Sequence, residues 1–238
     1  MKTILALLLL LTALPASALD LTALRDQTRE LTLDTGTRLR FSTTTIDRYL
    51  NEAQRIAVTD TKSIRKSIHY ESTVGTTYYT MPSDYWQVQR VTYEDIEITE
   101  QTPIALSLKA GLKWETVQAR PTNFYINLSS RTLLGLYPVP GSTSSTGTIK
   151  IEYYSLPTDM TAITDTPFDG IQELTSFHYA LPYYAAYRLC AIDGRLDLMS
   201  LYRMEFYEGV QRMRREANNR PSYRPGMQPR TRSNRVGP

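Results

Sequence analysis

Two hydrophobic periods alternate along the chain. Near both ends, apolar residues recur at every third or fourth position, which is the period of a helix with one buried face. In the middle the period falls to two, which is typical of half-buried strands. The sequence therefore predicts an α+β fold, in which N- and C-terminal helices form a helical bundle with an inserted antiparallel β-rich block and an extended C-terminal tail. The predicted parts are an apolar segment over 1–18, a discontinuous helical module over 19–60 and 166–217, a β-rich insertion over 61–165 and a basic tail over 218–238.

Capping residues indicate where the early helices begin and end. Asp20 can cap a helix that runs to about Leu31. A hydroxyl among residues 42–44 can cap a second helix, which ends near 59–60. The buried face of this second helix is expected to hold Ile46, Leu50, Ala53 and Ala57.

A longer apolar stripe predicts the closing helices. It runs from Ile171 to Ile192, with Asp169 as a candidate cap and Gly194 just after its end. Pro182 lies inside this stripe and lacks a backbone N–H, so we expect a kink or an interruption there. A last helix follows, and its buried stripe is expected to hold Leu198, Tyr202, Phe206, Val210 and Met213.

Turn residues divide the β-rich region. Val91 is out of phase with Trp86 in the predicted strand 86–93, which predicts a β-bulge near Gln89–Arg90. Glu94–Asp95 is the expected hairpin tip. A short helix is predicted over 103–110, with Thr102 as its cap, Pro103 at its first position and Gly111 at its end.

Later strands follow from alternation. Phe124, Ile126 and Leu128 are expected to point inward, and so are Ile149, Ile151 and Tyr153 in a strand near 150. Between these strands, strand pairing is expected to stop at residues 137–141, because proline cannot donate to a ladder.

Charge distinguishes the C-terminus from the rest. Residues 211–238 hold eight arginines and one acid, so they carry +7; the whole chain carries +3, and the first 210 residues therefore sum to −4. Prolines and small polar residues bury too little apolar surface to offset the entropy of ordering, so the tail is expected to stay extended until a partner binds it. The candidate binding residues are Arg214, Arg215, Arg220, Tyr223, Arg224, Arg230, Arg232 and Arg235.

Two kinds of partner fit these arginines. Arginine forms bidentate pairs with carboxylates, and it also neutralises DNA phosphates. Tyr223 is the one aromatic residue after position 210, so the tail offers little stacking surface to single-stranded nucleic acid. The residues alone leave protein carboxylates and duplex phosphates open as targets.

Residues that could carry chemistry are few. Cys190 is the only cysteine and lies in an apolar stretch, which is typical of a small buried side chain. His178 lies on an apolar helix face, as core histidines do, far from His69. The paired acids fit solvated turns or helix faces; they are Glu94 with Asp95, Asp193 with Asp197, and Glu205 with Glu208. We therefore expect no catalytic, cofactor-binding or metal site, and no enzyme.

The first 18 residues allow two hypotheses. Lys2, the apolar run 4–14 and the small residues 15–18 have the pattern of a secretory signal peptide. Cleavage after Ala18 would make the chain a secreted or periplasmic β-rich binding protein. An uncleaved run of this length is short for a bilayer span, and we would then expect a helix buried against a neighbouring subunit.

Several motifs follow one another over residues 19–218. They are Asp47–Ala53 (DRYLNEA), Tyr79–Val88 (YTMPSDYWQV), Leu136–Pro140 (LYPVP), Ile149–Pro157 (IKIEYYSLP), and Phe177–Leu181 with Tyr184–Leu189. Their order resembles that of the head-to-tail adaptor (connector) proteins of tailed bacteriophages, especially short-tailed phages.

The resemblance implies a structural virion protein that is assembled in the host cytoplasm. It implies a ring of about twelve copies docked beneath the phage portal protein. Such a ring extends the DNA channel, lets double-stranded DNA pass without specific binding, and carries the tail tube or nozzle protein. In this family the C-terminal tail becomes ordered on the portal, which makes the candidate arginines portal-binding residues.

Overall fold

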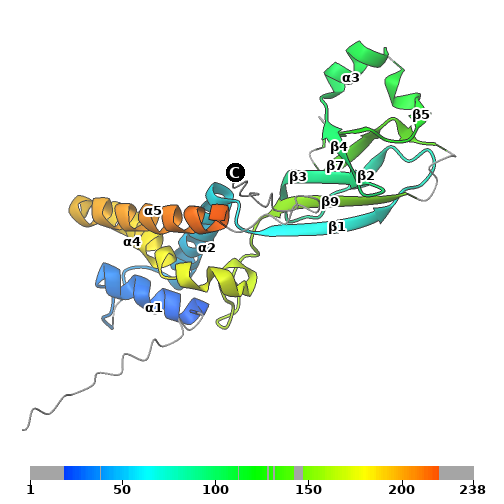
Figure 1. Ribbon diagram of the computed structural model, residues 1–238. Helices are drawn as coiled ribbons and strands as arrows, with labels where there is room; N and C mark the ends of the chain where they lie inside the picture. Colours follow the sequence, from blue (N-terminus) through cyan, green and yellow to red (C-terminus); the bar gives the residue numbers. More distant parts are fainter. Residues whose placement is uncertain are drawn as a thin grey trace, which may run out of the picture.

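The computed structural model describes residues 19–219, apart from 38, 112, 128, 131 and 142–146. The predictions for the signal-like segment 1–18, for the inward position of Leu128 and for residues 220–238 of the tail 218–238 lie outside the described residues. The first two residues of the predicted tail are the end of a helix that reaches Asn219. Within the described residues, the early and late helices gather at one end of the molecule, and the strands, together with the short helix α3, lie at the other (Figure 1). The α+β fold is therefore confirmed.

The helical module consists of two early and two late helices with the short 3₁₀ turns between them. Its elements are α1 (Leu21–Thr32), α2 (Thr43–Thr61), η3 (Phe168–Gly170), η4 (Gln172–Phe177), α4 (Ala180–Ile192) and α5 (Leu196–Asn219). The predicted caps are confirmed, since Asp20 accepts a hydrogen bond from the Ala23 amide and Ser42 accepts one from the Thr45 amide.

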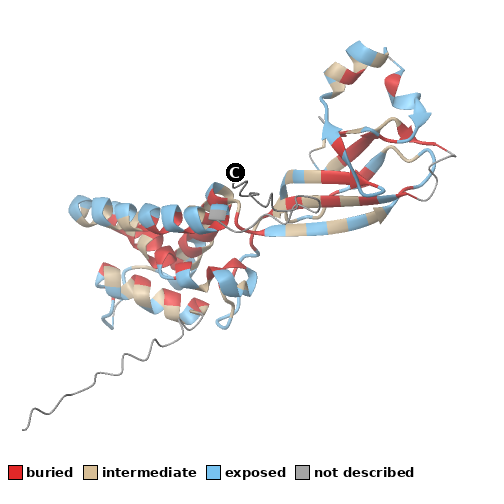
Figure 2. Cartoon of the chain, viewed as in Figure 1, coloured by how far each residue is buried: buried red, intermediate tan, exposed pale blue. Residues whose placement is uncertain are grey.

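Side chains from both chain ends form one core in this module. Leu24 and Leu50 from the early helices are fully buried beside Leu181 and Phe206 from the late ones. Burial is concentrated where these helices face each other (Figure 2). The bundle of N- and C-terminal helices is therefore confirmed.

The predicted interruption of the first late helix is present, but its start differs from the prediction. The chain forms η4, then enters α4 at Ala180, so Pro182 lies in the first turn, where a missing N–H leaves no gap in the helix. The prediction of Asp169 as a cap is wrong. Asp169 has a positive φ of 57° inside η3, and its carboxylate accepts from the Thr158 amide instead.

The β arm is built on a sheet of seven strands among the described residues, in the order β1-β9-β3-β4-β6-β7-β2. The sheet is mixed rather than antiparallel, because β4 and β6 pair in parallel. Its edge strands approach each other where the Tyr70 hydroxyl donates to the Thr80 carbonyl, so the sheet is nearly closed. The elements of the arm are β1 (Arg65–Glu71), β2 (Tyr78–Thr80), β3 (Tyr85–Tyr93), β4 (Ile96–Glu100), α3 (Pro103–Ala110), η1 (Trp114–Thr116), β5 (Gln118–Ala119), β6 (Asn123–Ile126), β7 (Leu133–Tyr137), β8 (Val139–Pro140) and β9 (Thr148–Ser155).

Local predictions for the arm are confirmed in part. The register of β3 against β9 shifts between Val88 and Arg90, as predicted, and again after Tyr85. Helix α3 has the predicted bounds. Pairing does not stop at 137–141, since Val139 donates to the Val117 carbonyl and β8 pairs with β5. Tyr125 is buried on the other side of β6 from Phe124, because Trp114 covers it with rings 5.0 Å apart.

Candidate functional site

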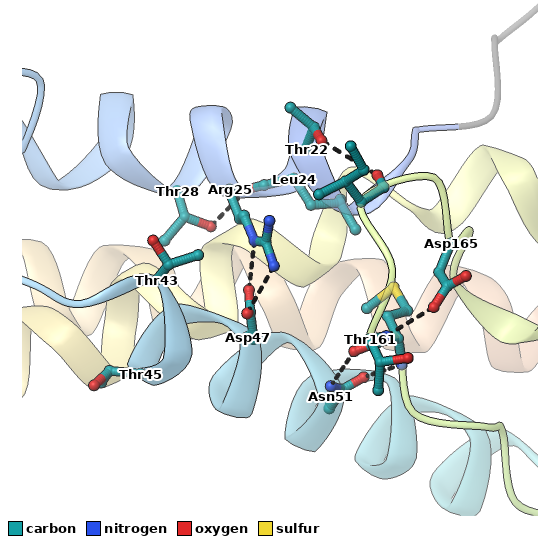
Figure 3. Close-up of polar contacts among 12 residues, drawn as sticks. Thr22, Leu24, Arg25, Thr28, Thr43, Thr45, Asp47, Asn51, Thr161 and Asp165 are labelled. Carbon is teal, nitrogen blue, oxygen red and sulfur yellow. Dashed lines mark hydrogen bonds and ion pairs between the residues drawn. The ribbon is translucent and has the colours of Figure 1, made fainter.

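The first motif of the sequence fastens α1 to α2. The Arg25 guanidinium makes a bidentate ion pair with Asp47, with nitrogen–oxygen distances of 2.6 and 2.8 Å. One turn on, Asn51 bonds both the carbonyl and the amide of Met160, which belongs to the strand-to-helix connection (Figure 3). Asp47 and Asn51 thus hold three separate stretches of chain in one arrangement.

The same motif joins α2 to α4. Glu52 accepts from the Tyr184 hydroxyl and from Arg188, each at 2.7 Å. The Arg188 guanidinium carbon also lies 4.9 Å from the centre of the Tyr49 ring. Burial, and next the hydrogen bond to Glu52, raise the pKa of Tyr184 to about 12. These residues set the helix spacing and offer no group for catalysis.

A polar cluster holds the junction between the module and the arm. Lys66 on β1 contacts Asp84 at 2.8 Å and Asp169 at 3.1 Å. Ser155, at the end of β9, donates to Asp84 as well. Burial opposes ionisation of Asp84, but the hydrogen bond from Lys66 and the other donors outweigh it and lower the pKa of Asp84. No sequence pattern predicts this cluster, because Lys66, Asp84 and Asp169 lie far apart in the chain, although Asp84 belongs to the second motif.

Helix α5 leads into the basic tail, and close packing sets its path. A Cβ on Gly209 would lie 2.7 Å from the Ala180 Cβ, so glycine allows α4 and α5 to approach closely. Near its end, Arg214 lies 3.7 Å from Asp60 of α2, and Arg215 is exposed on the outer face. The structure thus places two candidate portal-binding residues at the exit of the tail.

The remaining candidates follow α5 and lie outside the described residues. They are Arg220, Tyr223, Arg224, Arg230, Arg232 and Arg235. Arg214 is therefore the one candidate, within the described part, with an ion-pair partner on the body.

Other predictions about chemistry concern buried groups. Cys190 is a buried free thiol, as predicted. His178 is buried, and its Nδ1 accepts from the Leu19 amide, while Nε2 has no partner among the described residues. Burial lowers the pKa of His178 to about 4, so it is neutral at physiological pH. In the part of the chain that the structure describes, no group of three His, Cys, Asp or Glu side chains could hold a metal ion.

A family comparison identifies the kind of protein. The model of the SU10 adaptor protein family matches residues 19–232, which covers both closing helices and most of the tail. The chain belongs to this family. Members are structural adaptor proteins of bacteriophages, so this adaptor is a virion component involved in assembly. No curated protein matches the chain.

The family bears on the two hypotheses for localisation. The match begins directly after the signal-like segment and gives no support to the periplasmic alternative. No helix within the described ranges has both the length and the apolarity to cross a bilayer. The resemblance noted in the sequence is confirmed at the level of a phage adaptor.

Proposed function

We propose that this adaptor forms a ring of about twelve copies that docks on the portal protein of a short-tailed phage. The ring extends the DNA channel, lets duplex DNA pass without specific binding, and provides the platform for the tail tube or nozzle protein. Membership of the adaptor family over residues 19–232 carries this proposal.

The charge distribution supports docking through the tail. The last 28 residues carry +7, while the preceding 210 carry −4. An acidic surface on a partner protein attracts such a tail, and each charge-assisted hydrogen bond from an arginine contributes about 1.5–3 kcal/mol. In this proposal the portal-binding residues are Arg214, Arg215, Arg220, Tyr223, Arg224, Arg230, Arg232 and Arg235.

Replacing the five arginines after Asn219 with glutamine tests the docking. We expect co-sedimentation with the purified portal to weaken by more than about 100-fold, because several charge-assisted bonds are lost. The matched control replaces the same five arginines with lysine, which keeps the charge and removes the bidentate geometry. It should weaken binding by an intermediate amount.

Two results would contradict the proposal. One is portal binding by the glutamine variant that equals that of the wild type. The other is tail-dependent, sequence-selective binding to naked duplex DNA at physiological salt, which would favour phosphates as the target.

A further inference from the structure

We propose that neighbouring copies join through two different surfaces of the helical module, an outer ridge of α5 on one copy and a groove beside α5 on the next. This inference rests on the proposed ring and names the surfaces that would close it. The ridge is bordered mainly by basic residues, whereas the groove is bordered mainly by acidic ones.

The groove lies between α1, α4 and α5 and encloses about 500 Å³. Its apolar lining is incompletely covered, since Leu33 is 73 % and Tyr179 36 % exposed. The other apolar and aromatic residues of this lining are Leu31, Pro182, Tyr183, Leu198 and Tyr202. Such a groove can accept large apolar side chains from a partner.

The ridge lies on the outer face of α5. Leu201, Met204 and Tyr207 are 44, 52 and 39 % exposed, although they sit in a helix that buries its other face. An α-helix turns about 200° over two residues, so Met204 points nearly opposite to Tyr202, which lines the groove. One helix therefore presents apolar side chains on two sides.

Opposite charges border the two surfaces. On α1, Glu30 lines the groove and exposed Asp26 lies one turn before it, and neither forms an ion pair among the described residues. Both arginines of α1 are already paired, Arg25 with Asp47 and Arg29 with Asp34. Arg195 also lines the groove, but its guanidinium donates to the Thr32 carbonyl at 2.9 Å. Two acids against one arginine leave the border of the groove with a net negative charge.

The border of the ridge is basic. Arg203 and Arg215 form no ion pair within the described ranges, and Arg203 lies 5.9 Å from the centre of the Tyr207 ring. Arg212 reaches Glu208 only at 3.5 Å, with both side chains more than half exposed. These arginines complement Asp26 and Glu30 of a second copy.

A second copy is the occupant that this arrangement fits. Pairing of ridge with ridge would bring arginines together, and pairing of groove with groove would bring acids together, so the pairing of ridge with groove is favoured. A contact between unlike surfaces of identical chains is heterologous, and it generates a ring when its repeated rotation closes. The position of the two surfaces on opposite sides of α5 leaves both accessible at once.

Cysteine crosslinking tests the pairing directly. Full-length protein with Leu33→Cys and Met204→Cys is treated with a short bismaleimide, with the wild type as background because Cys190 is buried. A heterologous contact links position 33 of one copy to position 204 of the next, so we expect a ladder of covalent multimers beyond the dimer. Each single variant alone can give at most a dimer, and mixing the two singles should give the mixed dimer.

The matched control moves one cysteine to the arm. Leu33→Cys with Leu108→Cys keeps an exposed leucine position, since Leu108 is 84 % exposed on α3, and should give no ladder. Absence of a ladder from the 33/204 pair, or an equal ladder from the control pair, would overturn the inference.

Charge reversal supplies a second measurement. Asp26→Arg with Glu30→Arg should lower the yield of multimers about tenfold or more, and so should Arg203→Glu with Arg215→Glu. Combining all four changes should restore the yield, since the borders are again complementary. Failure of this restoration would also contradict the pairing.

The experiment separates this inference from the proposed function. If the wild type binds the portal but the 33/204 pair forms no ladder, the surfaces are wrong and the docking proposal stands. If the wild type fails to bind the portal, the docking proposal falls whatever the ladder shows.

Discussion

The helical module and the β arm each have a buried apolar core, but the residues of the two cores are distributed differently along the chain. The module core joins Leu24 and Leu50 to Leu181 and Phe206, so its halves are separated by more than a hundred residues of sequence. The arm core lies within the continuous stretch from Tyr79 to Tyr153. We therefore expect the arm to form from its own segment, whereas the module must bring both chain ends together and meets a higher loop-closure cost.

Polar groups are also used differently in the two regions. The module contains a buried, neutral histidine, His178, whose ring accepts from the Leu19 amide just before α1. The module also buries tyrosines, Tyr49 and Tyr184, but in the arm the rings of Tyr93 and Tyr125 lie against Gly147 and Gly135. Acid should therefore weaken the module first, and added bulk at either of these two glycines should weaken the arm alone.

The largest expected effect concerns His178. Its pKa is about 4 when folded, below the ordinary value of 6.5, so protons bind more readily to the unfolded chain between these values. The contribution of neutral His178 to the stability of the fold is fully present above about pH 6.5 and is lost as pH falls toward the folded pKa of about 4. We expect the free energy of unfolding to fall by about 2–3 kcal/mol between pH 7 and pH 4 because of this group. Urea titrations followed by circular dichroism across this range measure it.

His178→Gln should remove this fall while keeping an acceptor for the Leu19 amide. The matched control is His69→Gln, at an exposed position of β1, which should retain the wild-type fall. An unchanged pH dependence in the His178 variant would show that acid acts on the module elsewhere.

A smaller effect is expected from Gly135→Ala in the arm. A Cβ there would overlap the ring of Tyr125, which Trp114 and Tyr78 hold edge-on at 5.0 and 6.0 Å. We expect the arm to lose about 1–3 kcal/mol through overpacking. Hydrogen exchange should show reduced protection in β6 and β7, with α4 unchanged.

Gly36→Ala is the control for this change, since nothing lies within 4 Å of a Cβ at that position. Equal loss of protection in α4 and β7 of the Gly135 variant would mean that the module and the arm unfold as one unit. The expectation that the arm is weakened alone would then be wrong.

Local signals predicted much of the fold. Asp20, Ser42 and Thr102 cap helices as expected, because a side-chain oxygen that accepts from the first turn depends on neighbours only. Predictions that depended on distant chain were less successful. Asp169 failed as a cap because its carboxylate binds Lys66, 103 residues away in sequence, as well as the Thr158 amide. The parallel pairing of β4 with β6 likewise depends on α3 crossing between them, which periodicity does not encode.

The candidate site was predictable in part. The tail arginines follow from charge alone, whereas the groove requires α1 and α5 to lie together, a contact between opposite ends of the chain. Arg215 was predicted from its charge, but its place beside Met204 and Tyr207 on one face follows from a helix that continues to Asn219. The division of the chain into 19–60 with 166–217 and 61–165 stays a prediction.

The smallest expected effect concerns the junction that joins the two regions. Asp84 has a lowered pKa, so its contribution is present above its ordinary pKa and is lost as pH falls through the folded value, below about pH 4. Asp84→Asn keeps one acceptor oxygen, which can serve Tyr153 or Ser155, and loses the ion pair with Lys66. Since the side chains of Lys66 and Asp84 are 37 and 29 % exposed, solvent screening limits the loss to about 1 kcal/mol at pH 7.

In urea titrations, the difference between wild type and Asp84→Asn should shrink as pH falls below about 4, because Asp84 then becomes protonated in the wild type. Asp95→Asn is the control, because Asp95 is at the exposed hairpin tip with a positive φ that asparagine also adopts. If the difference in unfolding free energy between wild type and Asp84→Asn stays the same while Asp84 is protonated, the substitution acts through packing and not through the ion pair. We expect the module to lose stability between about pH 6.5 and 4, where His178 titrates, and the junction to lose stability only below about pH 4, where Asp84 titrates. Different pH ranges for the two losses would show that module and junction respond to different titrating groups.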